Sequence, residues 1–161
     1  MYNKIMVPLD GSDLAECVMP HVEAIFSGFQ SKEVILVRVV NPFQLPVSVP
    51  AQGDFGFTEK DRRQLEANRK KTAKEYLEKM AGSLDIPEKV FSYAVLEGNP
   101  ANMLADYAAE NEVDLIVIAS HGRSGVSRWV MGSVAERIVR TSCIPIMMVR
   151  APGCEPKAKS G

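Results

Sequence analysis

Two long runs of apolar residues constrain what this chain can fold into. Residues 34–40 (VILVRVV) and 114–119 (DLIVIA) are almost continuously apolar and rich in β-branched side chains. Strands buried on both faces of a parallel sheet look like this, whereas half-exposed strands alternate between apolar and polar residues. Shorter runs at residues 5–9, 90–95 and 144–149 have the same character, and helical patterns separate all five. The chain is therefore predicted to be an α/β protein with a doubly wound, mainly parallel sheet of five strands and right-handed crossovers.

The size and the composition fit one globular domain. The chain has 161 residues, of which 46% are hydrophobic and 24% are charged, and it shows no internal repeat. Residues 1–150 are therefore predicted to form a single domain. Residues 151–161 carry proline, glycine and small side chains and are predicted to be a disordered tail.

The charge and the cysteines argue against several classes of function. Nineteen Lys and Arg against twenty Asp and Glu give a net charge of -1, which does not indicate binding to nucleic acid or to an anionic membrane. The three cysteines, Cys17, Cys143 and Cys154, lack metal-binding spacing, so no metal site built from side chains is predicted. The N-terminus has no signal-peptide pattern, and the longest apolar run is far short of the ~20 residues that cross a bilayer. A cytoplasmic location is expected.

Helix signals stand between the strands. Ser12 is placed to cap a helix that extends to Phe29, and residues 59–84 have strong helical propensity. Asn99 and Pro100 fit the cap and the first position of a further helix.

The segment between the second strand and the long helix has no visible period. Residues 42–57 contain three prolines and three phenylalanines. Two interpretations stay open for this segment: a lid over a binding site, or an irregular stretch packed by its own aromatic residues.

Two polar turns are predicted to meet at one edge of the sheet. Ligands in an open parallel sheet bind beyond the carboxyl ends of the strands, where the strand order reverses. Five strands most often take the order 3-2-1-4-5 or 2-1-3-4-5, and in the first order the strands at residues 5–9 and 114–119 are neighbours at that point. The turns that follow them, residues 10–12 (DGS) and 119–122 (ASHG), are the most polar glycine-bearing turns of the chain. The ligand site is predicted there.

The segment from Gly122 to Ser133 has features of an anion site. Gly122 and Gly125 allow close backbone approach or positive φ. Gly132 and Ser133 stand where a helix begins, with free N–H groups and the positive end of the helix dipole, and Arg123 adds charge nearby. A phosphate cradle and ordinary turn-and-cap geometry both fit this spacing. A Walker lysine is missing and no GxGxxG follows the first strand, which argues against the common ATP and dinucleotide loops.

Asp10 and His121 each have two interpretations. The Asp10 carboxylate, at the end of a strand, caps a turn or accepts hydrogen bonds from a ribose or adenine group. His121 is a loop imidazole satisfied by the backbone, or a general base. The sequence places no serine or cysteine nucleophile with that histidine, so the first interpretation of His121 is favoured.

The chain resembles the universal stress protein family over about residues 2–150. The segments that carry the resemblance are residues 5–12 (IMVPLDGS), 34–40, 97–100 (EGNP) and 114–149. Nucleotide-binding members of that family show a glycine, two residues, a glycine, nine residues, and then a glycine with serine or threonine. Gly122, Gly132 and Ser133 match the second part of this motif, and Ala119 stands at its leading glycine.

The resemblance implies a Rossmann-like sheet in the order 3-2-1-4-5 that binds ATP or AMP, with Mg²⁺ bridging the phosphates. It implies that Asp10 bonds the adenosine part, that Pro8 and Val39 line the base, and that mainly backbone N–H groups hold the phosphates and the ribose. The family tends to dimerise through its last strand, here residues 146–149. The nucleotide-binding residues expected from the sequence are Pro8, Leu9, Asp10, Ser12, Val39, Ala119, His121, Gly122, Arg123, Gly125, Gly132, Ser133 and Val134.

The expected function is an adenine-nucleotide-binding stress-response protein that works as a dimeric, nucleotide-dependent regulator. Two alternatives stay open: a nucleotide-free dimeric interaction module, which Ala119 favours, and a slow ATP hydrolase. No catalytic residue is predicted, because no base with a partner is evident. Valine in place of Gly132 is expected to abolish nucleotide binding and to leave the fold intact.

Overall fold

A parallel sheet of five strands forms the centre of the computed structural model, which describes residues 2–42, 58–121 and 131–150. The strands are β1 (Lys4–Pro8), β2 (Glu33–Val40), β3 (Phe91–Glu97), β4 (Leu115–Ala119) and β5 (Ile146–Val149). They lie in the order β3-β2-β1-β4-β5, and every neighbouring pair is parallel. The predicted fold class and strand order are therefore confirmed, and the order reverses between β1 and β4.

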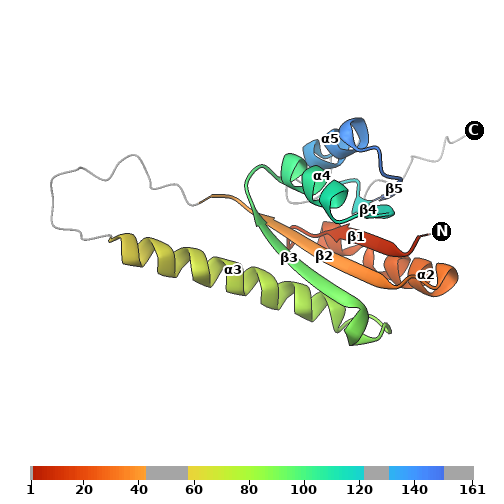
Figure 1. Cartoon of the computed structure of the whole chain (residues 1–161), viewed down its shortest axis with the longest axis horizontal. Coiled ribbons are helices and arrows are strands. Elements are labelled where there is room, and N and C mark those ends of the chain that lie inside the picture. The colour runs from red at the N-terminus through yellow and green to blue at the C-terminus, as the bar shows by residue number, and fades with distance from the viewer. Residues whose placement is uncertain (1, 43–57, 122–130, 151–161) are drawn as a thin grey trace, which may run out of the picture.

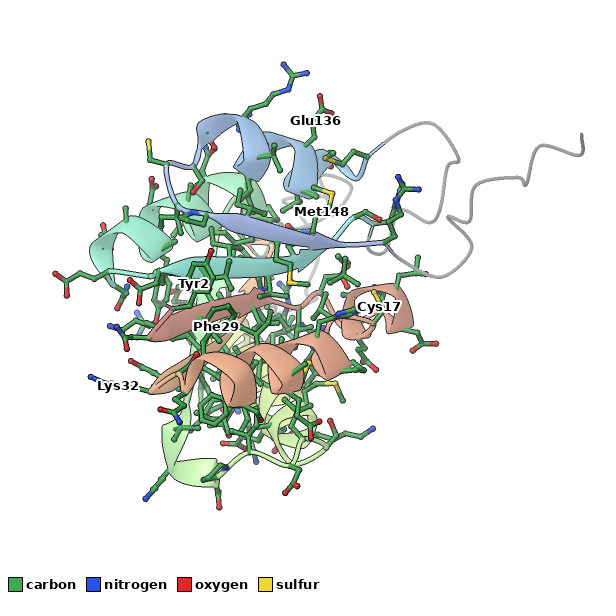
Figure 2. The ribbon with its side chains drawn as sticks, turned by 90° about the vertical axis from the view of Figure 1, so that its right-hand side faces the viewer. Tyr2, Cys17, Phe29, Lys32, Glu136 and Met148 are labelled. Atoms are coloured by element: carbon green, nitrogen blue, oxygen red, sulfur yellow. The ribbon has the colours of Figure 1, made fainter. Side chains whose placement is uncertain are left out.

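Helices cover both faces of the sheet (Figures 1 and 2). One face carries α1 (Asp13–Glu16), α2 (Met19–Phe29) and α3 (Glu59–Ala81), and the other carries α4 (Pro100–Glu110) and α5 (Ser133–Thr141). A 3-10 turn, η1 (Glu88–Val90), leads into β3. This three-layer arrangement explains the apolar runs, because a sheet covered on both sides buries both faces of its central strands.

Alternate residues of the central strands build the two halves of the core. Ile5 and Val7 of β1 belong to the cluster under α1, α2 and α3, whereas Met6 belongs to the cluster under α4 and α5. All five residues of β4 are buried. The carboxyl ends of β1 and β4 are thus held in place by packing on both faces of the sheet.

The predicted helix from Ser12 to Phe29 is in fact two helices. Ser12 caps α1 as predicted, and its Oγ accepts a hydrogen bond from the Ala15 amide at 3.3 Å. α1 ends at Glu16, and α2 begins at Met19 with Pro20 in its first turn. Since proline has no N–H to donate, a single helix could not keep its ladder of hydrogen bonds through this position.

Other predicted boundaries differ by a few residues. The helix predicted over residues 59–84 ends at Ala81, where Gly82 forms the C-cap. The strand predicted over residues 90–95 runs from Phe91 to Glu97, because Val90 is the last residue of the 3-10 turn. The last strand begins at Ile146 instead of residue 144, directly after a proline.

α3 has two halves with different anchoring. Its buried residues, Ala73, Leu77, Met80 and Ala81, all lie in the second half. The first half runs past the sheet (Figure 1) and is held mainly within itself, by the Thr58–Asp61 capping box and by ion pairs along the helix. Hydrogen bonds from Arg62 and Arg63, both about one helical turn away, accordingly lower the pKa of Glu59 to about 2. Within the described residues, neither α3 nor any other helix is long and apolar enough to span a membrane.

Asn99 is a helix cap whose loss has a defined cost. Its side chain accepts a hydrogen bond from the Asn102 amide at 3.3 Å, and Pro100 follows at the first helical position, as predicted. Asn99→Ala is expected to lower the free energy of unfolding by about 1 kcal/mol, because a backbone donor loses its partner. Urea denaturation measures this change. Asn99→Asp, which keeps an acceptor, is expected to stay near wild type, and equal losses in the two variants would contradict a capping role.

Candidate functional site

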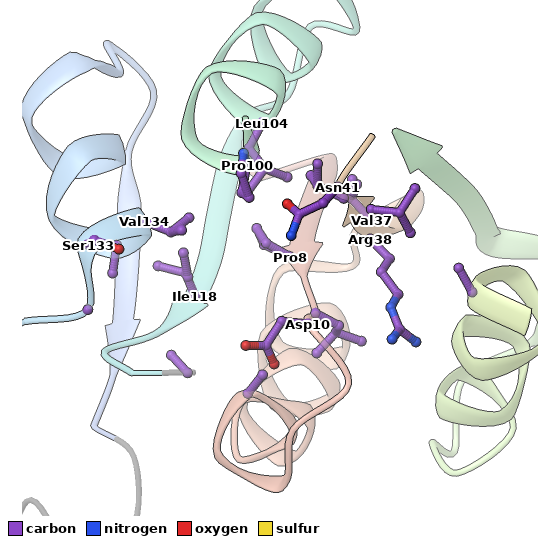
Figure 3. A pocket seen from close by; sticks show the side chains of 18 of the residues that line it. Pro8, Asp10, Val37, Arg38, Asn41, Pro100, Leu104, Ile118, Ser133 and Val134 are labelled. Atoms are coloured by element: carbon purple, nitrogen blue, oxygen red, sulfur yellow. The ribbon is translucent and has the colours of Figure 1, made fainter. Parts of the chain in front are cut away.

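A cleft of about 710 Å³ opens at the carboxyl ends of β1, β2 and β4 (Figure 3). It lies at the predicted place, where the strand order reverses. Ser133 and Val134 of α5 form one side, Pro8 and Asp10 stand in the middle, and the opposite side is formed by the end of β2 and by α3. The cleft therefore spans the sheet from its α5 side to its α3 side.

The turn after β1 presents Asp10 to this cleft. The Ser12 amide donates to Asp10 Oδ1 at 3.0 Å, and the Ser12 hydroxyl donates to the same oxygen at 2.6 Å. Gly11, between them, has φ of +84°, a conformation that glycine adopts without strain. Figure 3 shows the carboxylate turned toward the side where β4 and α5 lie. Asp10 thus caps its own turn, and the turn fixes its carboxylate at the cleft.

The start of α5 is pressed against the end of β4. The Gly132 amide donates to the Ser120 carbonyl at 2.8 Å. A Cβ at Gly132 would lie 3.0 Å from that carbonyl oxygen and 3.4 Å from the Cα of His121, so only glycine fits here without a shift. Gly132 lets the start of α5 approach the end of β4 closely. Its own N–H is already bonded to the Ser120 carbonyl. The contact of Gly132 with a nucleotide stays a prediction.

The next three amides are placed differently. The first hydrogen bond inside the helix is donated by Glu136 to the Gly132 carbonyl, at 2.9 Å. Within the described residues, the amides of Ser133, Val134 and Ala135 have no acceptor, and no side chain caps the helix. All three residues line the cleft. A helix start of this kind offers N–H donors and the positive end of the dipole to an anion.

Ser120 and His121 form a buried pair at the end of β4. The Ser120 hydroxyl and His121 Nδ1 are 3.0 Å apart, and both residues are less than a tenth exposed. No serine was predicted as a partner of this histidine, although the neighbouring residue supplies it. A hydroxyl and an imidazole in contact are shared by structural pairs and by nucleophile–base pairs. Slow hydrolysis therefore stays a prediction.

The middle of the cleft is apolar on the side that faces α4. Pro8, Val39, Pro100 and Leu104 line it there, and Pro8 and Pro100 lie near each other in Figure 3. Such a surface suits a flat aromatic group, whereas the α5 side of the same cleft suits an anion. The two chemistries stand side by side, which is the arrangement a phosphorylated aromatic ligand requires.

The match to a known family agrees with this geometry. Residues 1–150 match the model of the universal stress protein family. The chain belongs to the universal stress protein family. The motif positions that the structure describes, Ala119, Gly132 and Ser133, all line the cleft.

Two universal stress proteins of the archaeon Methanocaldococcus jannaschii are among the relatives. MJ0531 is 32% identical over 153 residues, which cover 94% of this chain and 84% of that protein. The solved structure of MJ0577 has a TM-score of 0.73 at 27% identity and covers 93% of this chain and 96% of its own. A universal stress protein of Arabidopsis thaliana, solved with AMP bound, has a TM-score of 0.58 at 15% identity, with 96% and 97% covered. This last likeness shows the fold alone.

Most of the expected site residues that are described line the cleft. Ser12 acts through its hydrogen bonds to Asp10, whereas Gly122, Arg123 and Gly125 lie outside the described residues. The expected residues that line the cleft are Pro8, Leu9, Asp10, Val39, Ala119, His121, Gly132, Ser133 and Val134. Their contacts with a nucleotide stay predictions.

Ala119, which replaces the leading glycine of the family motif, fits its position. It is the last residue of β4 and is buried with the apolar cluster under α1 and α2. Among the described residues, positive φ occurs at Gln30, Glu112, Gly11 and Gly98, and not at Ala119. The backbone here does not require glycine, so the methyl group alone gives no reason to reject a ligand.

The α3 side of the cleft was not predicted from the sequence. Leu65, Asn68, Arg69 and Thr72 of α3 line the cleft beside Arg38 of β2. Arg69 is placed by a hydrogen bond from its Nη2 to the Asn41 carbonyl, at 3.0 Å. Among these residues, only Arg38 could have been recognised from the sequence, because it is a charged residue inside an otherwise apolar strand.

Gly132 gives a sharp test of the contact between α5 and β4. Any side chain at this position meets the Ser120 carbonyl, so Gly132→Val is expected to lower the free energy of unfolding by about 2 kcal/mol and to weaken ligand binding. The earlier expectation of an intact fold is revised for this reason. Thermal denaturation measures the loss. Gly28→Ala in α2 is the matched control: its Cβ would meet no described atom within 4 Å, so no loss is expected. Equal stability of both variants would contradict the close approach.

Proposed function

We propose that this universal stress protein binds an adenine nucleotide, ATP or AMP, in the cleft and works as a dimeric, nucleotide-dependent regulator. The observation that carries the proposal is the row of amides from Ser133 to Ala135 at the start of α5, without acceptors in the described structure, on the wall of a cleft that also presents Asp10. The amide donors, the carboxylate and the apolar surface together match the phosphate, the sugar hydroxyls and the base of a nucleotide.

Each part of the nucleotide has a proposed place. The phosphates lie at the amides of Ser133, Val134 and Ala135, Asp10 accepts a hydrogen bond from the adenosine part, and Pro8 and Val39 contact the base. The AMP bound by the Arabidopsis thaliana relative supports this class of ligand. Within the described residues, no three His, Cys, Asp or Glu side chains gather to hold a metal. Mg²⁺ is therefore proposed to be held mainly by the phosphates and water, as at many nucleotide sites.

The dimer is proposed to form along β5. In the described sheet β5 is an edge strand paired with β4, and its residues Ile146, Met147 and Met148 are only half-buried. An apolar strand with an open edge is a template for pairing with a second chain. Sedimentation equilibrium tests this part, and a monomer at high protein concentration would contradict it.

Nucleotide binding is tested directly on the purified protein. After denaturation, any released nucleotide is identified by chromatography, and ATP and AMP are then titrated by calorimetry. A few charge-assisted hydrogen bonds from amides support micromolar affinity, about -8 kcal/mol. Absence of binding to both nucleotides at millimolar concentration would reject the proposal and favour a nucleotide-free interaction module. ATP turnover above about 1 s⁻¹ would instead indicate an enzyme.

A further inference from the structure

Arg38 is a charged residue in the middle of an apolar strand. It follows Val37 in β2, and its side chain points to the face that α3 covers (Figure 3). Its position is half-buried and lines the cleft. Burying a guanidinium is costly unless partners compensate it, so the contacts of Arg38 indicate what the residue does.

The guanidinium rests on Tyr76 of α3. Its central carbon is 4.8 Å from the centroid of the Tyr76 ring, within the range of a cation–π contact. The Tyr76 hydroxyl donates to Glu16 Oε1 at 3.0 Å. Burial, and then the hydrogen bond to Glu16, raise the pKa of Tyr76, so the phenol stays protonated and keeps its place at neutral pH. The ring also packs against the apolar cluster under α1, α2 and α3, so Tyr76 is a platform whose place does not depend on the hydroxyl alone.

The guanidinium also lies close to Gly11. Arg38 Nη2 is 2.9 Å from the position that a Cβ on Gly11 would occupy. Gly11 is the centre of the turn that holds Asp10, and its φ of +84° also favours glycine. The guanidinium therefore stands between the α3 platform and the Asp10 turn, on the side opposite to the Asp10 carboxylate (Figure 3).

We propose that Arg38 is a positioning residue: held over Tyr76, its guanidinium braces Gly11 and so keeps the Asp10 carboxylate directed at the nucleotide. The inference rests on the proposed function. Without the brace, the turn keeps its hydrogen bonds between Ser12 and Asp10 but loses its support from the α3 side. The carboxylate then accepts the ligand's hydrogen bond in a smaller fraction of molecules.

The first measurement needs no ligand. The Ser12 amide donates to Asp10 Oδ1, so its hydrogen exchange reports how often the turn opens. Arg38→Met keeps the length of the side chain but loses the charge and the planar guanidinium, so exchange at Ser12 is expected to be about tenfold faster. Arg38→Lys, which keeps the charge, is expected to restore part of the protection. Tyr76→Leu is expected to act like Arg38→Met. Tyr76→Phe, which keeps the ring and loses only the hydroxyl, is the matched control and is expected to stay close to wild type.

The second measurement uses AMP and three analogues: 2′-deoxy-AMP, 3′-deoxy-AMP and AMP without its 6-amino group. The analogue that lacks the donor to Asp10 is identified as the one whose affinity penalty disappears in Asp10→Ala, which has no acceptor. In the wild type this penalty is expected to be about tenfold. In Arg38→Met the affinity penalty of this analogue relative to AMP is expected to shrink to less than about threefold. In Tyr76→Phe the penalty is expected to stay at the wild-type value.

The outcomes separate this inference from the proposed function. Unchanged exchange at Ser12 in Arg38→Met, or an undiminished penalty in a variant that binds AMP, would overturn the role of Arg38. An equal loss for AMP and all analogues, with normal Ser12 exchange, would also overturn it, because that pattern indicates direct contact with the ligand. If the wild type binds no nucleotide, the proposed function fails, and faster Ser12 exchange in Arg38→Met still supports the brace.

Discussion

Replacing Ser133 by glutamate is expected to weaken the binding of ATP and AMP about a hundredfold and to leave the fold intact. Ser133 is exposed at the first position of α5, so a longer side chain has room. A carboxylate there occupies the amides that the phosphates would use and repels their charge. Losing one or two charge-assisted hydrogen bonds of 1.5 to 3 kcal/mol corresponds to about two orders of magnitude in affinity. Calorimetric titration of both nucleotides measures the change.

The control for this variant has the same shape without the charge. Ser133→Gln is expected to bind within about threefold of wild type, because the backbone amides stay available. An acidic residue in the first turn of a helix is favourable, so Ser133→Glu is expected to melt at or slightly above the wild-type temperature. Equal affinities of the glutamate and glutamine variants would show that the anion does not sit at the start of α5.

The sheet could be predicted from the sequence because its signal is local and redundant. Residues 34–40 and 114–119 are apolar at nearly every position, and only a sheet covered on both faces accommodates this. The break between α1 and α2 was missed although Pro20 marks it. The helical period of the apolar residues continues across the break. The prediction followed this period and did not take into account that Pro20 has no N–H to donate.

The site was predictable where it is built from the ends of strands and the start of a helix. Asp10 and Ser133 belong to turns whose place follows from the strand order. The roles of Gly132 and Arg38 depend on atoms brought together across the fold: the Ser120 carbonyl in one case, and Tyr76 in the other. No spacing in the sequence reports such contacts, so the tight approach at Gly132 and the α3 side of the cleft required the structure.

The contribution of α3 to stability is concentrated in its second half. Leu77 is completely buried in the cluster with β1 and β2, whereas Leu65, on the same helix, is 38% exposed beside the cleft. The ion pairs of the first half lie on the surface, where each is worth little. The second half must therefore hold the helix on the sheet.

Leu77→Ala is accordingly expected to lower the free energy of unfolding by about 3 kcal/mol, since it removes buried methyl groups and leaves a cavity. For a domain of this size that corresponds to a melting temperature about 6 to 12 °C lower. Leu65→Ala makes the same chemical change in the same helix and is expected to cost less than about 1 kcal/mol. Urea and thermal denaturation measure both variants. Similar losses would mean that the first half of α3 is packed as firmly as the second, and the α3 side of the cleft would then be part of the core instead of a wall open to ligand.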